Sequence, residues 1–286
     1  MPNLRDIKRR IKSVKNTQQI TKAMKLVSAS KLRKAQEAII SARPYALKLM
    51  EVLHHLSARC NHDIHPLLDD RDGNRWLILS ITADRGLAGA FNSNVIKMAQ
   101  KEIDKFGKDK SVLICIGKKS LSHFKIRKYN IIEDYIDFWS ELGFQHAISM
   151  GEKIMSHFIS GEADEVQVIY NKFINVGKQE VQHEKFLPLT YDSQDESSSM
   201  MTDRIYEPSK ESVVKVMVPK YLNTQIWQYL LESFASEQAA RMLAMENATT
   251  NAEDMIKDLS LKFNKARQSA ITTEMLEIVS GAEALN

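Results

Sequence analysis

The chain has few of the features that would place it across a membrane or in a secretory pathway. No stretch approaches the roughly 18 consecutive apolar residues that a transmembrane helix needs. The first residues lack the apolar run of a secretory signal, and their basic, presequence-like pattern continues unbroken into a helix. With only 6 prolines and 10 glycines in 286 residues, the composition favours long helices with few turns. We therefore expect no membrane span.

Cysteine and histidine lack the spacing of a metal site or a catalytic site. The 2 cysteines, Cys60 and Cys115, lie in different segments and are predicted to be free thiols in a reducing compartment. Four of the 8 histidines gather near the end of the first helical segment, at His54, His55, His62 and His65. No cysteine or carboxylate pattern completes a tetrahedral site around them, and no Ser/His/Asp or Cys/His grouping stands out. We expect no metal ion and no catalytic residue on this chain.

Charge is distributed unevenly along the sequence. Residues 1–36 hold eleven Lys and Arg against the single acid Asp6, a net charge of +10. Residues 220–286 hold six basic and nine acidic side chains, a net charge of −3. The first segment is thus predicted to seek an acidic partner, of which the last segment supplies only part. Nucleic acid remains an alternative partner, although residues 1–44 contain no aromatic side chain on which bases could stack.

Apolar residues in the first 57 positions follow the three- and four-residue steps of a coiled-coil seam. One stripe consists of Leu4, Ile7, Ile11 and Val14, and a second of Ala35, Ala38, Ala42, Tyr45, Leu49, Val52 and Leu56. Between them the steps reach Thr17, Thr21, Ser28 and Lys31, whereas Ile20 and Val27 fall elsewhere. We predict a seam that weakens there and is not used for ordinary helix pairing. Pro44 is predicted to bend or break the helix.

The last segment repeats this pattern with smaller side chains. Its seam is predicted to be Arg241, Met245, Ala248, Ala252, Met255, Leu259, Lys262 and Ala266, with Ile256 and Phe263 adding width. Small residues permit close approach of two helix axes, and methionine fills irregular gaps. Pro219 is predicted to separate a short helix, about 209–218, from the main one. The two terminal helices are expected to pair antiparallel as a long coiled coil.

Between the terminal helices, short apolar runs alternate with amphipathic segments. Strands are predicted at 76–82, 112–117, 129–135, 166–170 and 181–189, the last at an edge, and helices at 92–106 and 141–160. This alternation predicts a Rossmann-like, mainly parallel α/β domain with helices on both faces. The polar, Ser-rich residues 191–203 are interpreted as a loop. The predicted divisions are a helix at 1–57, the α/β domain at 74–190, a connection at 191–208 and a helix at 209–286.

Residues Ala83–Asn92 follow a predicted strand and precede a predicted helix, which is where doubly wound folds hold phosphates. The segment has only Gly86 and Gly89, and it lacks a complete phosphate-binding glycine motif. We therefore favour a tight turn with Asp84 or Asn92 near the helix cap. A nucleotide-binding enzyme built on the middle domain remains an alternative.

Four separated motifs carry a resemblance to a known family: Gln19–Ala35, Ala83–Asn92, Ser236–Thr249 and Asn264–Leu285. Asn171–Asn175 and Arg204–Pro208 are also similar to it. In chain order, over residues 3–285, the motifs resemble the gamma subunit of F-type ATP synthase. The departures are few: Ala88 stands where many relatives carry Cys, and Ala90 where Gly is common. The regulatory insertion with paired cysteines of the chloroplast type is absent, so no thiol switch of that type is expected.

The resemblance implies a non-catalytic rotor shaft. In that family the terminal helices enter a ring of alpha and beta subunits, and the α/β domain lies beside the epsilon subunit on the membrane ring of c subunits. Proton flow turns the shaft, and ATP chemistry occurs on the beta subunits. The implied setting is peripheral, at the cytoplasmic face of a bacterial inner membrane, with no cofactor and no nucleic acid.

The resemblance also assigns residues. Met24 would lie near the moving region of a beta subunit, and Arg267, Gln268 and Thr272 would form a catch with a beta-subunit loop. Tyr206 and Glu207 would help seat the foot on the c ring. The basic face would meet acidic beta-subunit surfaces through Lys15, Lys22, Lys25, Lys31, Arg33 and Lys34. From its residue type alone, Arg267 fits equally a bidentate grip on a carboxylate and a solvated helix face. A basic coiled-coil scaffold that binds nucleic acid is the remaining alternative.

Overall fold

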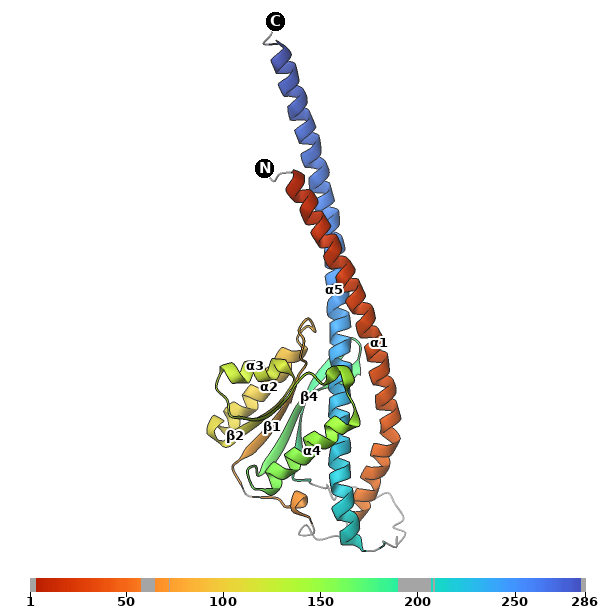
Figure 1. Cartoon of the computed structure of the whole chain (residues 1–286), viewed down its shortest axis with the longest axis vertical. Coiled ribbons are helices and arrows are strands. Elements are labelled where there is room, and N and C mark those ends of the chain that lie inside the picture. Colours follow the sequence, from red (N-terminus) through yellow and green to blue (C-terminus); the bar gives the residue numbers. More distant parts are fainter. Residues whose placement is uncertain (1–3, 58–64, 72, 190–206, 208, 284–286) are drawn as a thin grey trace. The chain divides into compact units, whose positions relative to one another are not determined.

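The computed structural model describes the chain apart from residues 1–3, 58–64, 72, 190–206, 208 and 284–286 (Figure 1). The chain divides into two compact units. We call Met1–Ala29 with Arg241–Asn286 the terminal unit, and Ser30–Ala240 the sheet unit. Two long helices, α1 (Leu4–Ser57) and α5 (Lys210–Glu283), each contribute residues to both units.

The sheet unit is built on five strands in the order β3-β2-β1-β4-β5. The strands are β1 (Trp76–Ile81), β2 (Ser111–Ile116), β3 (Ile131–Tyr135), β4 (Glu165–Asn175) and β5 (Lys178–Leu187). All neighbouring pairs are parallel except the antiparallel hairpin of β4 and β5. The predicted mainly parallel sheet with an edge strand is therefore confirmed, although the edge strand starts at Lys178 and ends at Leu187.

Helices cover both faces of the sheet (Figure 1). On one face, α2 (Phe91–Phe106) and α3 (Lys118–Ile126) pack on Ile78, Leu113 and Ile169. On the other face, α4 (Phe144–Ile159) and the first part of α5 join a larger core with Leu77, Leu79 and Val168. Strand β1 reads WLILSI because a central parallel strand buries side chains on both of its faces. Within the described residues, short 3₁₀ helices lie at η2 (Pro66–Leu68), η3 (Lys108–Lys110) and η4 (Trp139–Glu141).

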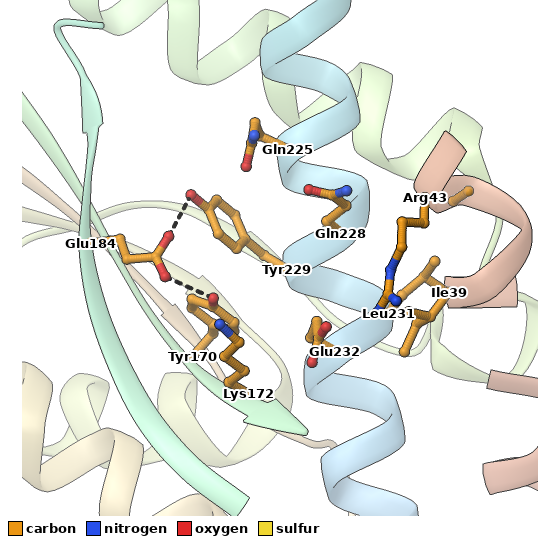
Figure 2. A pocket seen from close by; sticks show the side chains of 11 residues that line it. Ile39, Arg43, Tyr170, Lys172, Glu184, Gln225, Gln228, Tyr229, Leu231 and Glu232 are labelled. Atoms are coloured by element: carbon orange, nitrogen blue, oxygen red, sulfur yellow. Dashed lines mark hydrogen bonds between the residues drawn. The ribbon is translucent and has the colours of Figure 1, made fainter. Parts of the chain in front are cut away.

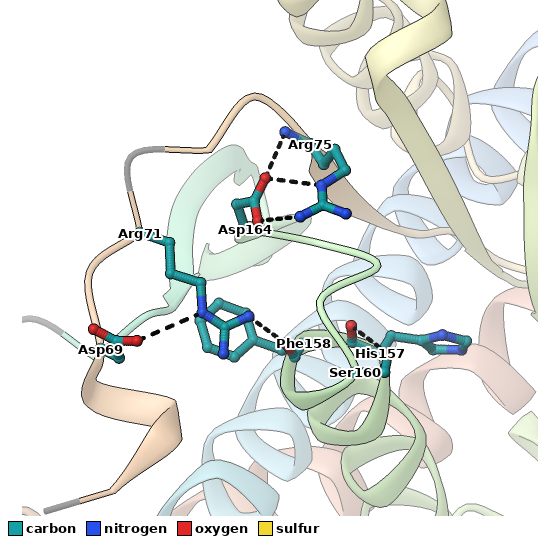
Figure 3. Close-up of polar contacts among 7 residues, drawn as sticks. All are labelled: Asp69, Arg71, Arg75, His157, Phe158, Ser160 and Asp164. Atoms are coloured by element: carbon teal, nitrogen blue, oxygen red, sulfur yellow. Dashed lines mark hydrogen bonds and ion pairs between the residues drawn. The ribbon is translucent and has the colours of Figure 1, made fainter. Parts of the chain in front are cut away.

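Polar contacts hold the segment that leads into β1 (Figure 3). Arg75 donates from Nε, Nη2 and its backbone amide to the buried carboxylate of Asp164, at 3.0, 2.9 and 3.1 Å. Arg71 donates to the backbone oxygen of Phe158 at 2.7 Å and covers that ring at 4.5 Å. The hydrogen bonds from Arg75 lower the pKa of the Asp164 carboxyl. Two arginines thus fasten this segment to the end of α4 and the start of β4.

The predicted break at Pro219 is wrong, because α5 runs without interruption from Lys210 to Glu283. An interior proline costs about 3 kcal/mol in a helix. Val214, Val218, Leu222 and Ile226, each four residues from the next, are all buried in the sheet-unit core. The burial of this face, at about 1.5–3 kcal/mol for each side chain, offsets the cost of the proline. Pro44 likewise lies inside the unbroken α1.

In the sheet unit, the buried stripe of α1 differs from the prediction at Tyr45. That side chain is 56% exposed, and Ala46 is buried in its place. The stripe takes a four-residue step from Ala42 to Ala46 and continues to Leu49 and Leu53. The step buries a small methyl group and leaves the phenol in water. The predicted Val52 is half-buried beside Leu53, and the side chain of the predicted Leu56 lies outside the described residues.

In the terminal unit, α1 and α5 pair antiparallel, as predicted. Thr21 bonds to Thr249 and Lys25 bonds to Glu246, so the partner number on α5 falls as the number on α1 rises. On α5 the seam passes from Ala252 to Ile256, Leu259, Phe263 and Ala266, all of them buried or half-buried. Met255 and Lys262, predicted as seam residues, are exposed because the helix takes a four-residue step after Ala252.

Candidate functional site

The middle of the terminal-unit seam is polar and buried. Thr21 and Ser28 are only 8% and 2% exposed, and the Thr21 and Thr249 hydroxyls lie 2.8 Å apart. Each hydroxyl also contacts its own helix, at Gln18 O (3.0 Å) and Met245 O (2.7 Å). The apolar seam is therefore interrupted here, as predicted, and the two helices pair through hydroxyl groups in place of apolar side chains. The register runs through Gln18 and not Thr17, and the Thr21 and Thr249 hydroxyls bond to each other across the seam.

The same stretch of α1 leaves apolar side chains facing solvent. Ile20, Leu26 and Val27 are each more than half exposed, and Met24 is half-buried. Since exposed apolar residues that gather together mark interaction surfaces, this part of α1 is a candidate binding surface. The described chain does not cover it.

The predicted basic face consists of exposed and partly paired side chains. In the terminal unit, Lys15 and Lys22 are exposed, while Lys25 is half-buried and contacts Glu246 at 2.7 Å. In the sheet unit, Lys31, Arg33 and Lys34 are exposed, and Arg33 pairs with Glu37 at 3.0 Å along its own helix. Such exposed pairs contribute only about 0–1 kcal/mol, so they leave these cations available to an acidic surface.

The end of α5 is exposed on all sides within the described chain. Residues 267–282 are helical and every one of them is exposed. They include five large apolar side chains, Ile271, Met275, Leu276, Ile278 and Val279. Because a helix of this length in water is stabilised mostly by packing of an apolar face, this surface is a strong candidate for a partner.

Three predicted site residues lie at the start of this exposed end. Arg267, Gln268 and Thr272 are all exposed, and Thr272 donates its hydroxyl to the backbone oxygen of Gln268 at 3.0 Å. No hydrogen bond or ion pair engages the side chains of Arg267 and Gln268 within the described chain. A hollow of about 490 Å³ lies just before them, between α1 and α5, where Ile7, Leu259 and Ala266 contribute apolar surface.

The two predicted foot residues are not equally described. Glu207 is exposed, and Tyr206 lies outside the described residues. Several cysteine and histidine predictions also fall there: Cys60, His62 and the side chains of His54 and His55. His65 accepts a hydrogen bond from the amide of Leu67 at 3.2 Å and so caps η2. Cys115 is a free, buried thiol, and burial raises its pKa to about 11.

The turn after β1 uses its polar side chains to hold itself. Asn92 accepts from the amide of Ala83 at 2.9 Å and donates to the oxygen of Arg85 at 3.3 Å. Asp84 accepts from the amides of Lys118 and Asp137, each at 2.9 Å. Gly89 adopts a φ of 55°, which glycine accommodates without strain. This arrangement confirms the predicted tight turn, and the carboxylate of Asp84 at the strand end disfavours a bound phosphate.

The sheet unit also holds a polar cavity of about 240 Å³ between α1, α5 and the β4–β5 hairpin (Figure 2). Glu184 accepts hydrogen bonds from Tyr170 at 2.8 Å and Tyr229 at 3.1 Å on one side of it. Arg43 and Lys172 place positive charge in the same lining. Sequence reasoning missed this network because Tyr229 on α5 lies far along the chain from the β4–β5 hairpin that carries Tyr170 and Glu184.

No group of three or more His, Cys, Asp or Glu side chains within the described residues is placed to hold a metal ion. Among the described helices, none combines the length and apolar character needed to cross a membrane.

Comparison with known proteins matches residues 3–285 to the family described as ATP synthase. The chain is 47% identical to the ATP synthase gamma chain of Chloroherpeton thalassium and 48% identical to that of Prosthecochloris aestuarii. Each alignment covers 100% of this chain and 99% of the relative.

Solved structures share the fold. A chain of the Euglena gracilis mitochondrial ATP synthase, from a structure of its OSCP, F1 and c-ring, is 21% identical with a TM-score of 0.69, covering 99% of this chain and 94% of that one. A chain of the Tetrahymena thermophila central stalk and c-ring is 24% identical with a TM-score of 0.63, covering 80% and 99%. On the full-length match and the identity to its bacterial relatives, this chain belongs to the ATP synthase gamma-chain family.

Proposed function

We propose that this chain is the central rotor shaft of a bacterial F-type ATP synthase. It would couple proton flow through a membrane c ring to ATP synthesis or hydrolysis on beta subunits. The observation that carries the proposal is the antiparallel pair of terminal helices, beyond which α5 continues as an exposed, apolar helix. The membership of the gamma-chain family supports the same reading.

The role would be mechanical and non-catalytic. The terminal helices would turn inside a ring of alpha and beta subunits, and the sheet unit would bind the epsilon subunit and the c ring. The proposed setting is peripheral, at the cytoplasmic face of the inner membrane. Neither a cofactor nor nucleic acid is required by this role.

The proposed contacts with beta subunits suit a moving surface. The exposed cations Lys15, Lys22, Lys31 and Lys34 can attract acidic side chains without tight docking, because solvent screens each pair. Lys25 and Arg33 already have partners in the chain, but their positive charges would add to the attraction for acidic side chains. Met24 would contribute a flexible apolar contact beside them. Weak contacts of this kind allow rotation, whereas a strong one would hold the shaft in place.

The exposed end of α5 would provide a catch. The planar fork of Arg267 can bind a carboxylate through two parallel hydrogen bonds, and the amide of Gln268 is free to add a third. Thr272 lies one turn further along the same face. Just before the start of α5, Tyr206 and Glu207 would help seat the chain on the c ring.

The test is reconstitution with alpha, beta and the remaining subunits, followed by assays of ATP hydrolysis and ATP-driven proton pumping. Removing residues 267–286 should lower proton pumping severely, because the exposed end of α5 is lost. Arg267→Ala with Gln268→Ala should give a smaller loss, and Lys265→Ala, which alters a neighbouring exposed cation, is the matched control. Unchanged pumping by the truncated chain would contradict the assignment of the catch. Full coupling of a complex assembled without the chain would contradict the shaft itself.

Two further measurements decide between this function and the alternatives. Filter binding with a salt titration would reveal a nucleic-acid scaffold as affinity that falls steeply with salt. Calorimetry of the isolated chain with nucleotides would reveal a nucleotide enzyme as tight, stoichiometric binding. The shaft proposal expects neither result.

A further inference from the structure

Three side chains of α5 bond to the sheet from one face of the helix. Tyr229 donates to Glu184 of β5 at 3.1 Å, and Glu232 accepts from the amide of Phe173 in β4 at 2.8 Å. Ser236 donates to the backbone oxygen of Asn171 in β4 at 3.0 Å. Their spacing of three and four residues places them in one row along the helix. We call Tyr229, Glu232 and Ser236 the α5 ladder.

The first contact of the ladder is reinforced by a second tyrosine (Figure 2). The two carboxylate oxygens of Glu184 each accept one phenol, from Tyr170 and from Tyr229. The tyrosine rings lie 4.7 Å apart, and Phe186 packs edge-on against Tyr229. Burial and the nearby Glu184 raise the pKa of both phenols, so each remains a protonated donor at physiological pH. A hydrogen bond from a buried donor to a carboxylate is among the stronger contacts in proteins.

The last contact of the ladder extends into the domain. Ser236 is fully buried, and Asn171, whose oxygen it binds, donates its own side-chain amide to the oxygen of Phe91 at 3.2 Å. Phe91 begins α2 and clusters with Ala83 and Ala88, against which Ala240 of α5 packs. The ladder therefore connects α5 through β4 to the start of α2.

The ladder differs in kind from the rest of the contact between α5 and the sheet. Val214, Val218, Leu222 and Ile226 contribute apolar packing, which is strong but non-directional. Hydrogen bonds restrict both distance and angle, so they fix the rotation and the axial position of a helix more tightly than apolar contacts do. A helix held only by its apolar stripe could turn or slide slightly before meeting resistance.

We propose that Tyr229, Glu232 and Ser236 are the positioning residues that lock α5 to the sheet against rotation about its own axis. This inference rests on the proposed shaft function, and it names the junction through which torque passes between the sheet unit and α5. Force applied to the sheet unit reaches the helix through directed bonds to β4 and β5. Without the ladder, α5 moves against the sheet, and this movement absorbs part of that force.

The experiment compares matched variants in the assembled complex. Tyr229→Phe combined with Glu232→Met removes two ladder bonds while keeping a ring and an unbranched side chain. Tyr221→Phe is the control, because that phenol lies on the same helix and, among the described residues, accepts its hydrogen bond from Gln225 of that helix at 2.9 Å. Glu232→Gln is the conservative variant, because its amide oxygen can still accept from Phe173. Amide exchange at Phe173 reports separately whether the ladder bond is broken.

We expect the double variant to hydrolyse ATP normally but to pump about twofold fewer protons for each ATP, because two directed hydrogen bonds to half-buried carboxylates are lost. The control and the conservative variant should keep the wild-type ratio. If Phe173 exchanges faster in the double variant while the ratio is unchanged, the inference is overturned. If the double variant does not assemble, Tyr229→Phe alone, which keeps the ring packing, carries the same comparison.

The two levels of proposal fail differently. A wild-type complex that hydrolyses ATP without pumping protons would overturn the shaft function and the ladder together. A coupled wild-type complex with an equally coupled double variant would overturn the ladder alone.

Discussion

Helix α5 is one continuous helix with two kinds of surface. Up to Ala240 it lies in the sheet unit, where one of its faces is buried against a sheet and fixed by directed hydrogen bonds. From Arg241 it belongs to the terminal unit, where a narrow seam is buried and residues 267–282 are wholly exposed. The difference shows that a long helix can form when only part of its length is buried within the chain. One stretch anchors it, and the other remains available to partners.

The seams of the two units differ in chemistry as well as in area. The sheet-unit core is aliphatic and aromatic, whereas the terminal-unit seam includes the hydroxyls of the buried Thr21 and Ser28 and of the half-buried Thr249. Apolar packing gives more stability for each residue buried. Paired hydroxyls contribute less stability, but they favour one register, because a shift would break the hydrogen bond between Thr21 and Thr249 across the seam.

The largest expected effect is in the sheet-unit core. Phe158→Ala removes a fully buried ring that also supports Arg71, and should lower the free energy of unfolding by about 3–5 kcal/mol. Urea denaturation followed by tryptophan fluorescence measures it, because Trp76, Trp139 and Trp227 all lie in the sheet unit. A loss below about 1 kcal/mol would show that this core is not tightly packed.

An intermediate effect should depend on pH. Hydrogen bonds from Arg75 lower the folded-state pKa of Asp164 below its ordinary value, which is about 3.9. The pair therefore stabilises the fold above that pH, and its contribution disappears as the pH falls through the folded-state pKa. Asp164→Ala should destabilise the chain at neutral pH.

Stability measured for the wild type and for Asp164→Ala at several pH values checks this sign. The difference between the two proteins should shrink as the pH falls below about 4, because Asp164 then binds a proton in the unfolded wild-type chain before it does so in the folded one. A difference that is constant across the acid range would show that the pair contributes through packing and not through its charge.

A smaller effect is expected in the polar seam. Thr21→Val leaves the Thr249 hydroxyl facing a methyl group and should cost about 1 kcal/mol, whereas changing both residues to valine should be close to neutral. Hydrogen exchange of the α1 amides measures both variants within the terminal unit. If the double variant were the less stable of the two, the pair would have to be stronger than an ordinary neutral hydrogen bond.

The smallest effect is expected at the exposed end of α5. Leu276→Ala in the isolated chain should change stability by less than about 0.5 kcal/mol, since the side chain is 62% exposed and already solvated. Circular dichroism during thermal unfolding measures it. In the assembled complex the same substitution should be costlier, and equal costs in both settings would mean that no partner covers this face.

Local patterns in the sequence were enough to predict much of the fold. Apolar residues three and four positions apart predict the helices, and apolar runs such as WLILSI predict the strands, because each element must bury its own apolar face. The exact seam was harder to predict. The predicted seam residues Tyr45 and Met255 each lie one position before the residue that is packed, Ala46 or Ile256. The residues in each pair are apolar enough to fit a seam. Only the partner surface decides which one is buried.

Other features could not be predicted because they depend on residues distant in sequence. Pro219 is typical of a helix break, and it is tolerated since the face around it is buried in a core. The site residues Arg267, Gln268 and Thr272 were assigned by resemblance, and the structure adds that they stand in solvent. Their contacts with beta subunits stay a prediction until the complex is tested.

The sequence by itself determined two terminal helices with three- and four-residue seams, an alternating α/β middle and a strongly basic first segment, because those are properties of neighbouring residues. Only the tertiary structure decided that hydroxyls fill the middle of the helix pair and that Glu184 joins two tyrosines. It likewise decided that α5 bonds to β4 and β5 through one row of side chains. The physical reason is that burial and hydrogen bonding depend on what lies opposite a side chain, and the chain fixes that only when it folds.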